Sequence, residues 1–230
     1  MIYATTEIHG VTFDEIIDLK YPNYRWENLY AGGKDICGYF PLYEKYLPKI
    51  VDNFLEIGIA MGISIKMFRD YYGAGNFHAL NNNWGAQGVI SKGVLESQGI
   101  ICHDGDQADL EFLSKIDTQF DVIIDDGSHR SDHQITTFQY LFNNNLKPGG
   151  LYVVEDLHCC LDSYWWGSVS KFEDTLLSLL LGYSKTTLGK LENCFATAHP
   201  TNLKTTDGFF TEPIDKVFLY NPSIAFIFKK

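Results

Sequence analysis

Phe120-Asp121-Val122-Ile123-Ile124-Asp125-Asp126-Gly127-Ser128-His129 is the stretch that decides the fold of this 230-residue chain. An apolar run of strand length ends abruptly in two carboxylates, a glycine and a histidine. Leu151-Tyr152-Val153-Val154-Glu155-Asp156-Leu157-His158 repeats the pattern further along. Runs that are apolar throughout, rather than alternating, are typical of parallel strands buried on both faces.

The segments on either side alternate between strand and helix patterns. Strands are predicted at 53–59, 77–80, 99–103, 120–124 and 151–154, and helices at 64–72, 89–97 and 132–142. A turn is predicted at 147–150, an aromatic loop at 159–170, a helix at 172–183, and a terminal hairpin at 217–228 around Asn221-Pro222. This order predicts an α/β fold with a mostly parallel sheet and a C-terminal antiparallel hairpin.

Right-handed crossovers place the carboxyl ends of all parallel strands on one edge of the sheet, where open α/β folds bind their ligands. Asp125, Asp126, Glu155 and Asp156 would meet at that edge. Clustered carboxylates repel one another, and a divalent cation would relieve the repulsion. Oxygen ligands favour a hard ion such as Mg²⁺, so we expect the chemistry at this pair of strand ends.

Composition sets further limits on the class of protein. A hydrophobic content of 45% predicts a substantial core, and a formal charge of −11 argues against a nucleic-acid-binding protein. No signal-peptide pattern and no membrane-length apolar window are present, so a soluble, cytoplasmic protein is expected. Five cysteines without metal-ligand spacing are interpreted as reduced thiols: Cys37, Cys102, Cys159, Cys160 and Cys194.

Two glycine-containing segments follow predicted strands. Glu56-Ile57-Gly58-Ile59-Ala60-Met61-Gly62 opens a helix, and its glycines would let the backbone approach a ligand closely. Its spacing is not the dinucleotide fingerprint, and a simple tight turn explains it equally well. In Gly105-Asp106-Gln107-Ala108-Asp109, Asp106 would serve as a helix N-cap, as a ligand contact, or as both.

Together these motifs resemble the class I S-adenosylmethionine (SAM) methyltransferases, and in particular the metal-dependent sugar O-methyltransferases of macrolide tailoring, the mycinamicin and macrocin type. The likeness runs from about Lys34 to Ser178. Its specific parts are Asp125–His129, Glu155–His158, 68–72, 133–138 and the Lys-Pro-Gly-Gly at 147–150.

The resemblance implies a Rossmann-like class I methyltransferase domain over residues 49–230. It also implies an N-terminal extension, residues 1–48, that contributes to the cofactor or substrate site. It assigns Asp126, Glu155 and Asp156 to Mg²⁺ and His129 to the general base. The implied SAM contacts are Lys34, Tyr39, Glu56, Gly58, Gly62, Asn81, Asp106 and Gln107, while Asp125 either faces SAM or orients its neighbours. In the aromatic loop, Tyr164 and Trp165 either stack on a sugar ring as a lid or are simply core or interface aromatics. His158 is a candidate substrate contact or a residue that supports the metal ligands.

One position departs from the family pattern. The second strand should end in an acid that binds the ribose hydroxyls, but this chain has Asn81 there. A neutral acceptor is weaker than a charged one, and the loss of affinity corresponds to roughly 1 kcal/mol or somewhat more.

The expected function is Mg²⁺-dependent methyl transfer from SAM to a sugar hydroxyl of a natural product, surface glycan or nucleotide-sugar. A catalytically lapsed binding protein on the same scaffold is the alternative, and a metal-dependent hydrolase would leave 56–62 unexplained. The expected partner is a small-molecule sugar or glycoside, with no nucleic acid and no membrane. The acceptor and a homo-oligomeric state are left open by the sequence.

Overall fold

The structure is a computed structural model that describes residues 11–21, 34–35, 37–187, 214–220 and 223–230, with the backbone alone at 182–187. The N-terminal stretch before residue 11, Asn221-Pro222 and Cys194 therefore lie outside the described residues. Within the described part, no helix is long and apolar enough to cross a membrane.

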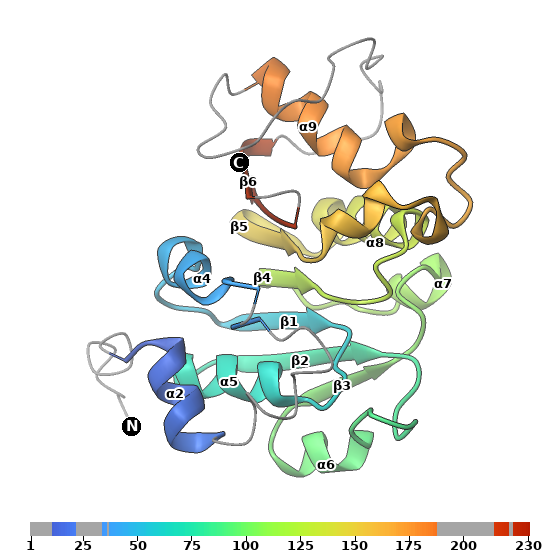
Figure 1. The fold of residues 1–230 in the computed structure, drawn as a ribbon. Helices are drawn as coiled ribbons and strands as arrows, with labels where there is room; N and C mark the ends of the chain where they lie inside the picture. Colours follow the sequence, from blue (N-terminus) through green and yellow to red (C-terminus); the bar gives the residue numbers. More distant parts are fainter. Residues whose placement is uncertain (1–10, 22–33, 36, 188–213, 221–222) are drawn as a thin grey trace.

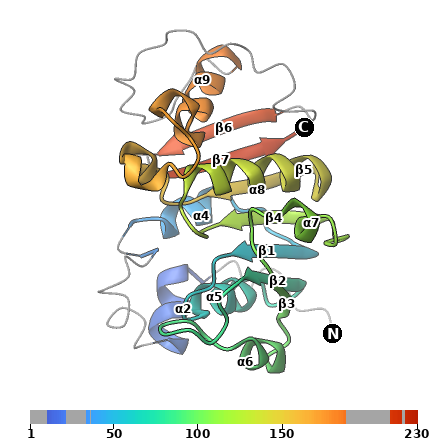
Figure 2. The same ribbon diagram turned by 90° about the vertical axis from the view of Figure 1, so that its right-hand side faces the viewer.

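A seven-stranded sheet forms the centre, in the order β3-β2-β1-β4-β5-β7-β6 (Figure 2). The first five strands pair in parallel, and β7 is antiparallel to both β5 and β6. The strands are β1 (Asn53–Ile57), β2 (Asn76–Asn81), β3 (Ile101–Asp104), β4 (Phe120–Asp125), β5 (Leu146–Val154), β6 (Ile214–Tyr220) and β7 (Ile224–Lys229).

Helices connect the parallel strands and cover the sheet (Figure 1). The α-helices are α2 (Phe13–Lys20), α4 (Phe40–Tyr46), α5 (Ile63–Tyr72), α6 (Lys92–Ser97), α7 (Leu110–Leu113), α8 (Ser131–Asn144) and α9 (Leu176–Thr187). Short 3₁₀ turns η2 (Leu157–Leu161), η3 (Ser163–Trp165) and η4 (Phe172–Asp174) follow β5.

Each face of the sheet has its own hydrophobic core, because successive strand residues point to opposite sides. In β1, Phe54 lies in the core that contains residues of α2, α4 and α5, whereas Leu55 lies in the core shared with α8 and α9. The strand is buried on both faces, as its apolar sequence predicts. The α/β fold with its C-terminal antiparallel pair is thereby confirmed.

Some predicted boundaries were wrong. The turn predicted at 147–150 is part of β5. Leu146 pairs with Phe120 and Leu151 pairs with Val122, so residues 147–150 form an irregularity within the β4–β5 ladder. The helix predicted at 89–97 begins only at Lys92, and the helix predicted at 172–183 is a 3₁₀ turn followed by α9. The aromatic loop predicted at 159–170 contains the end of the 3₁₀ turn η2 and the whole of η3.

The N-terminal extension is more regular than its weak periodicity suggested. Thr12 caps α2 in a complete capping box with Glu15, which fixes where that helix begins. The boundary predicted at residues 48/49 falls between α4 and β1, but the buried residues of α2 and α4 belong to the same core as β1.

Candidate active site

The ends of β1, β4 and β5 lie side by side in the middle of the sheet, and hydrogen bonds continue the pairing into the loops. The amide of Asp126 donates to the carbonyl of Ile57 (2.9 Å), and that of Glu155 donates to the carbonyl of Asp125 (2.9 Å). The strand order reverses between β1 and β4, which is where open α/β sheets form a ligand crevice.

A cavity of about 440 Å³ opens at this edge. That volume is in the usual range for small-molecule sites. Most of the predicted site residues line it, including the glycine-containing segment after β1, Asn81 after β2 and the two carboxylate clusters. The lining residues among those predicted are Lys34, Gly58, Asn81, Asp106, Gln107, Asp126, His129, Glu155 and Asp156.

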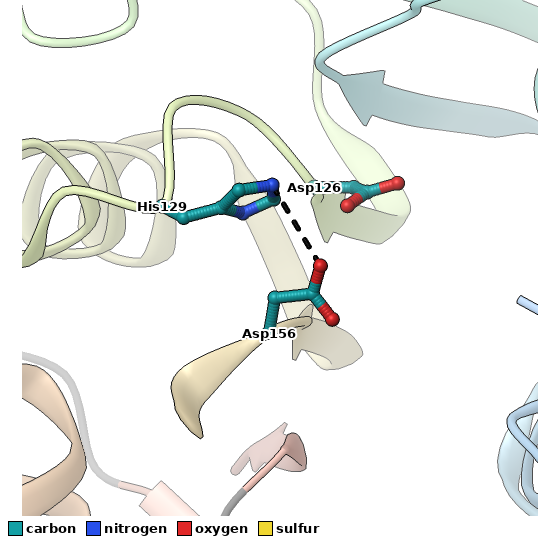
Figure 3. A group of neighbouring side chains, drawn as sticks. All are labelled: Asp126, His129 and Asp156. Carbon is teal, nitrogen blue, oxygen red and sulfur yellow. Dashed lines mark ion pairs between the residues drawn. The ribbon is translucent and has the colours of Figure 1, made fainter. Parts of the chain in front are cut away.

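Asp126, His129 and Asp156 form a group of potential metal ligands at the edge of the cavity (Figure 3). One ligand atom from each lies within 4.8 Å of the others, and His129 Nε2 is 3.7 Å from Asp156 Oδ2. The two carboxylates supply oxygen ligands of the kind that Mg²⁺ prefers, whereas imidazole is more typical of transition-metal sites. The carboxylates therefore fit Mg²⁺, and the imidazole beside them is placed for proton transfer.

His129 and Asp156 also have an uncommon backbone conformation. Their φ angles are 57° and 54°, in the left-handed region that residues other than glycine rarely adopt. Such conformations cluster at functional sites, where the surrounding structure holds them.

Glu155 is placed differently from its two neighbours in the predicted metal set. It is 1% exposed, and its Oε1 accepts hydrogen bonds from Lys34 Nζ (2.6 Å) and from the hydroxyl of Tyr43. Lys34 Nζ also contacts Asp126 Oδ2 at 2.7 Å. Burial opposes the charge on Lys34, but Asp126 and Glu155 raise its pKa well above the ordinary value.

Glu56 completes this buried group from the opposite side. Its Oε1 is 3.4 Å from Lys34 Nζ, and neither carboxylate oxygen has a hydrogen-bond partner among the residues described. Burial raises the pKa of Glu56 to about 7, against the opposing effect of Lys34. Tyr39, the other predicted extension residue, donates its hydroxyl to Asp156 Oδ1 at 2.8 Å.

Asp125 and Asp126 are adjacent in sequence but face different surroundings. Asp125 is fully buried, and Gln107 Nε2 (3.2 Å) and the hydroxyl of Tyr152 (3.3 Å) donate to it. Burial raises the pKa of Asp125 to about 6. The structure therefore places it beneath the cavity wall, where it orients Gln107, whose Oε1 accepts from the amide of Ser128 (2.7 Å).

Asp106 and Asn81 line the cavity, whereas Gly62 lies outside its lining. Asp106 does not cap a helix: its Oδ1 accepts from the amide of Ala108 (2.8 Å), and Asp109 caps α7 instead. Asn81 Nδ2 donates to Asn83 Oδ1 at 2.8 Å. Gly62 is the left-handed N-cap of α5.

Of the predicted substrate residues, Trp165 lies beside the general-base candidate, with its ring centroid 6.2 Å from that of His129. Asp132 holds this loop by accepting from the amide of Ser168 at 2.8 Å. The ring of Tyr164 packs edge-to-face against that of Trp165, but Tyr164 is 80% exposed, and His158 is also exposed.

Tyr43 is the site residue that sequence reasoning missed. It lies 112 positions from Glu155, within the helical sequence Phe40-Pro41-Leu42-Tyr43-Glu44-Lys45-Tyr46. The hydroxyl of a buried tyrosine usually has a hydrogen-bond partner. The sequence therefore predicts a polar contact for a buried Tyr43, but it does not indicate which residue provides it.

Comparison with known proteins finds sugar O-methyltransferases. The chain is 35% identical over 123 residues to mycinamicin VI 2''-O-methyltransferase of Micromonospora griseorubida, covering 49% of this chain and 28% of that protein. It is 27% identical over 208 residues to 8-demethyl-8-alpha-L-rhamnosyl tetracenomycin-C 2'-O-methyltransferase of Streptomyces olivaceus, covering 84% and 50%. No protein-family model matches.

Among solved structures, the fold is similar to that of the MycE methyltransferase from the mycinamycin pathway in complex with Mg and SAH. The TM-score is 0.63 at 26% identity, over 83% of this chain and 49% of that one. The chain thus spans at most about half the length of these relatives. The resemblance to macrolide-type sugar O-methyltransferases and the class I methyltransferase fold are confirmed.

Proposed function

We propose that this chain catalyses Mg²⁺-dependent transfer of a methyl group from SAM to a sugar hydroxyl of a glycosylated small molecule. The observation that carries the proposal is the convergence of Asp126, His129 and Asp156 within 4.8 Å at the edge of the cavity. The relatives support it, because they are O-methyltransferases named for mycinamicin VI and for a rhamnosyl tetracenomycin. MycE has also been crystallised with Mg, SAH and mycinamycin VI together.

We assign the cation to Asp126, Glu155 and Asp156, with Glu155 contributing once its contact with Lys34 is exchanged. When bound, Mg²⁺ would lower the pKa of the acceptor hydroxyl and fix its position. His129 then takes the hydroxyl proton as the methyl group passes in line from the sulfur of SAM to the acceptor oxygen. Trp165, beside His129, offers an aromatic face to the sugar.

SAM would occupy the cavity between the end of β1 and the end of β2. Gly58 lines this cavity, and Gly62 forms the left-handed N-cap of α5, whose N-terminus supplies free amides. Asn81 supplies a neutral amide where an acid is expected. It motivates the second candidate function, a methyltransferase-fold protein that binds ligands without transferring a methyl group.

The decisive experiment measures transfer of labelled methyl groups from SAM to a panel of glycosides, with Mg²⁺ and after EDTA treatment. We expect transfer that EDTA abolishes, and a loss of at least about 100-fold in Asp126→Asn. Asp121→Asn is the matched control. Asp121 lies near the start of the same strand, at the end away from the cavity, where its Oδ1 is 2.8 Å from Lys147 Nζ. Full activity in EDTA would contradict the proposal, and calorimetric silence toward SAM would favour the binding protein.

A further inference from the structure

The ammonium of Lys34 holds the oxygens that a cation would need. It lies 2.7 Å from Asp126 Oδ2 and 2.6 Å from Glu155 Oε1, and the side chain is only 5% exposed. Both carboxylates belong to the proposed metal set. A positive charge already bound to them reduces what a second cation gains there.

A second anionic position for the ammonium lies next to the first. Glu56 Oε1 is 3.4 Å from Lys34 Nζ, and the carboxylate of Glu56 is completely buried. Neither of its oxygens has a hydrogen-bond partner in the described part of the chain. A buried unsatisfied carboxylate is costly, so Glu56 would gain from a closer approach of the ammonium.

We infer that Lys34 is an internal competitor of Mg²⁺, which exchanges Asp126 and Glu155 for Glu56 when the metal binds. This inference rests on the proposed Mg²⁺ dependence. Lys34 is thus a positioning residue: it limits metal affinity and keeps the carboxylates together. It also joins the metal site to the glycine-containing segment after β1, which lines the proposed SAM cavity.

The test is the Mg²⁺ dissociation constant of the full chain, measured by calorimetry without SAM. We expect Lys34→Met to bind Mg²⁺ at least about tenfold more tightly than the unsubstituted chain. Lys147→Met is the matched control: it also removes a lysine that bridges two carboxylates, Asp52 (3.2 Å) and Asp121 (2.8 Å), at the far end of β4. Its Mg²⁺ affinity should not change.

A second pair of variants covers the case in which Lys34→Met fails to fold because Glu56 loses its counter-ion. The double variant Lys34→Met/Glu56→Gln removes both buried charges and is compared with Glu56→Gln alone. We expect the double variant to bind Mg²⁺ more tightly than the single one. A thermal melt should also show that Mg²⁺ raises the melting temperature more in Lys34→Met than in the unsubstituted chain.

The outcomes separate this inference from the proposed function. If neither the unsubstituted chain nor either Lys34 variant binds Mg²⁺, the proposed metal dependence is wrong and this inference fails with it. If that chain binds Mg²⁺ but removal of Lys34 leaves the affinity equal or weaker in both comparisons, Lys34 supports the metal rather than competing with it, and only this inference is overturned.

Discussion

His129 has two nitrogens in different surroundings, and its position suits two chemical roles. Nε2 lies 3.7 Å from Asp156 Oδ2 at the cavity edge, while Nδ1 is buried without a partner among the described residues. A metal ligand and a general base would both place an imidazole there. A metal ligand would contribute to Mg²⁺ affinity before any substrate binds. A general base would contribute to the rate of proton transfer instead.

Substitution of His129 by glutamine should therefore separate chemistry from binding. As the proposed base, His129→Gln should lower the rate of methyl transfer by about 10²–10⁴-fold, while the Mg²⁺ dissociation constant stays within a few-fold. Single-turnover transfer and Mg²⁺ calorimetry measure the two quantities. A large loss of Mg²⁺ affinity would instead identify His129 as a ligand. His133→Gln is a control on the neighbouring imidazole, whose Nδ1 lies 3.1 Å from Ser128 Oγ.

At the scale of elements, the site depends on how closely the end of β1 approaches the loop after β4. Gly58 has a φ of +80°, and a Cβ at this position would lie 2.0 Å from the carbonyl oxygen of Asp126. The backbones are therefore in direct contact at the point where the proposed metal ligand leaves its strand. A side chain here would push Asp126 out of place.

We expect Gly58→Ala to be much more destabilising than a glycine substitution with equal backbone strain. Gly149 offers that comparison, since its φ is +76° and a Cβ added there would meet no atom within 4 Å. Gly149→Ala should cost about 1–2 kcal/mol of unfolding free energy, and Gly58→Ala about 1–3 kcal/mol more, because it adds a steric clash. Urea unfolding measures both. Equal losses of unfolding free energy in the two variants would show that the loop after β4 moves aside without an energetic cost.

Strand β3, at one edge of the sheet, and its neighbour β2 contain a pair of histidines that should make stability depend on pH. His78 Nδ1 lies 2.9 Å from His103 Nε2, and their rings stack with centroids 5.2 Å apart. Burial, reinforced by His103, lowers the pKa of His78 from 6.5 to about 4. Between these values the unfolded chain binds more protons than the folded one, so this contribution to stability is lost as the pH falls from about 6.5 to 4.

The measurement is urea unfolding at several pH values across that window, in the unsubstituted chain and in His78→Gln. We expect His78→Gln to lose less stability on acidification. The raised pKa values of Glu56 and Asp125 act in the opposite direction, and both variants share them, so the difference reports on His78. His158→Gln, at an exposed position, should keep the original dependence. If the unfolding free energy of His78→Gln changed with pH as much as that of the unsubstituted chain, His78 would not be the cause of the pH dependence.

Strand ends were predictable from sequence because their cause is local. An apolar run followed by carboxylates indicates a buried strand and the polar edge after it, which located Asp126, Glu155 and Asp156. The different surroundings of Asp125 and Asp126 were not predictable, because they depend on which face each side chain meets. The contacts of Lys34 and Tyr43 with Glu155 span 121 and 112 positions, and no periodicity encodes such pairs.

At the scale of the whole molecule, the N-terminal helices belong to the core that supports the site. Phe13 of α2 is fully buried, and its ring lies 4.1 Å from that of Tyr71 and 5.6 Å from that of Phe68, both on α5. The centroid of its ring is also 6.0 Å from that of Tyr43, whose hydroxyl donates to Glu155. One continuous set of packed rings thus connects α2 to the carboxylate cluster.

Because of this packing, we expect Phe13→Ala to destabilise the whole domain and not only its first helix. Truncation of a fully buried phenylalanine typically costs about 3–5 kcal/mol of unfolding free energy. Leu19→Ala is the matched control on the same helix, since Leu19 is 79% exposed and its loss should cost less than about 0.5 kcal/mol. Far-UV circular dichroism and tryptophan fluorescence should shift together in urea, as one cooperative transition. If Phe13→Ala left the main transition in place and produced a separate early one, residues 1–48 would be an independent unit, and the site could not depend on their packing.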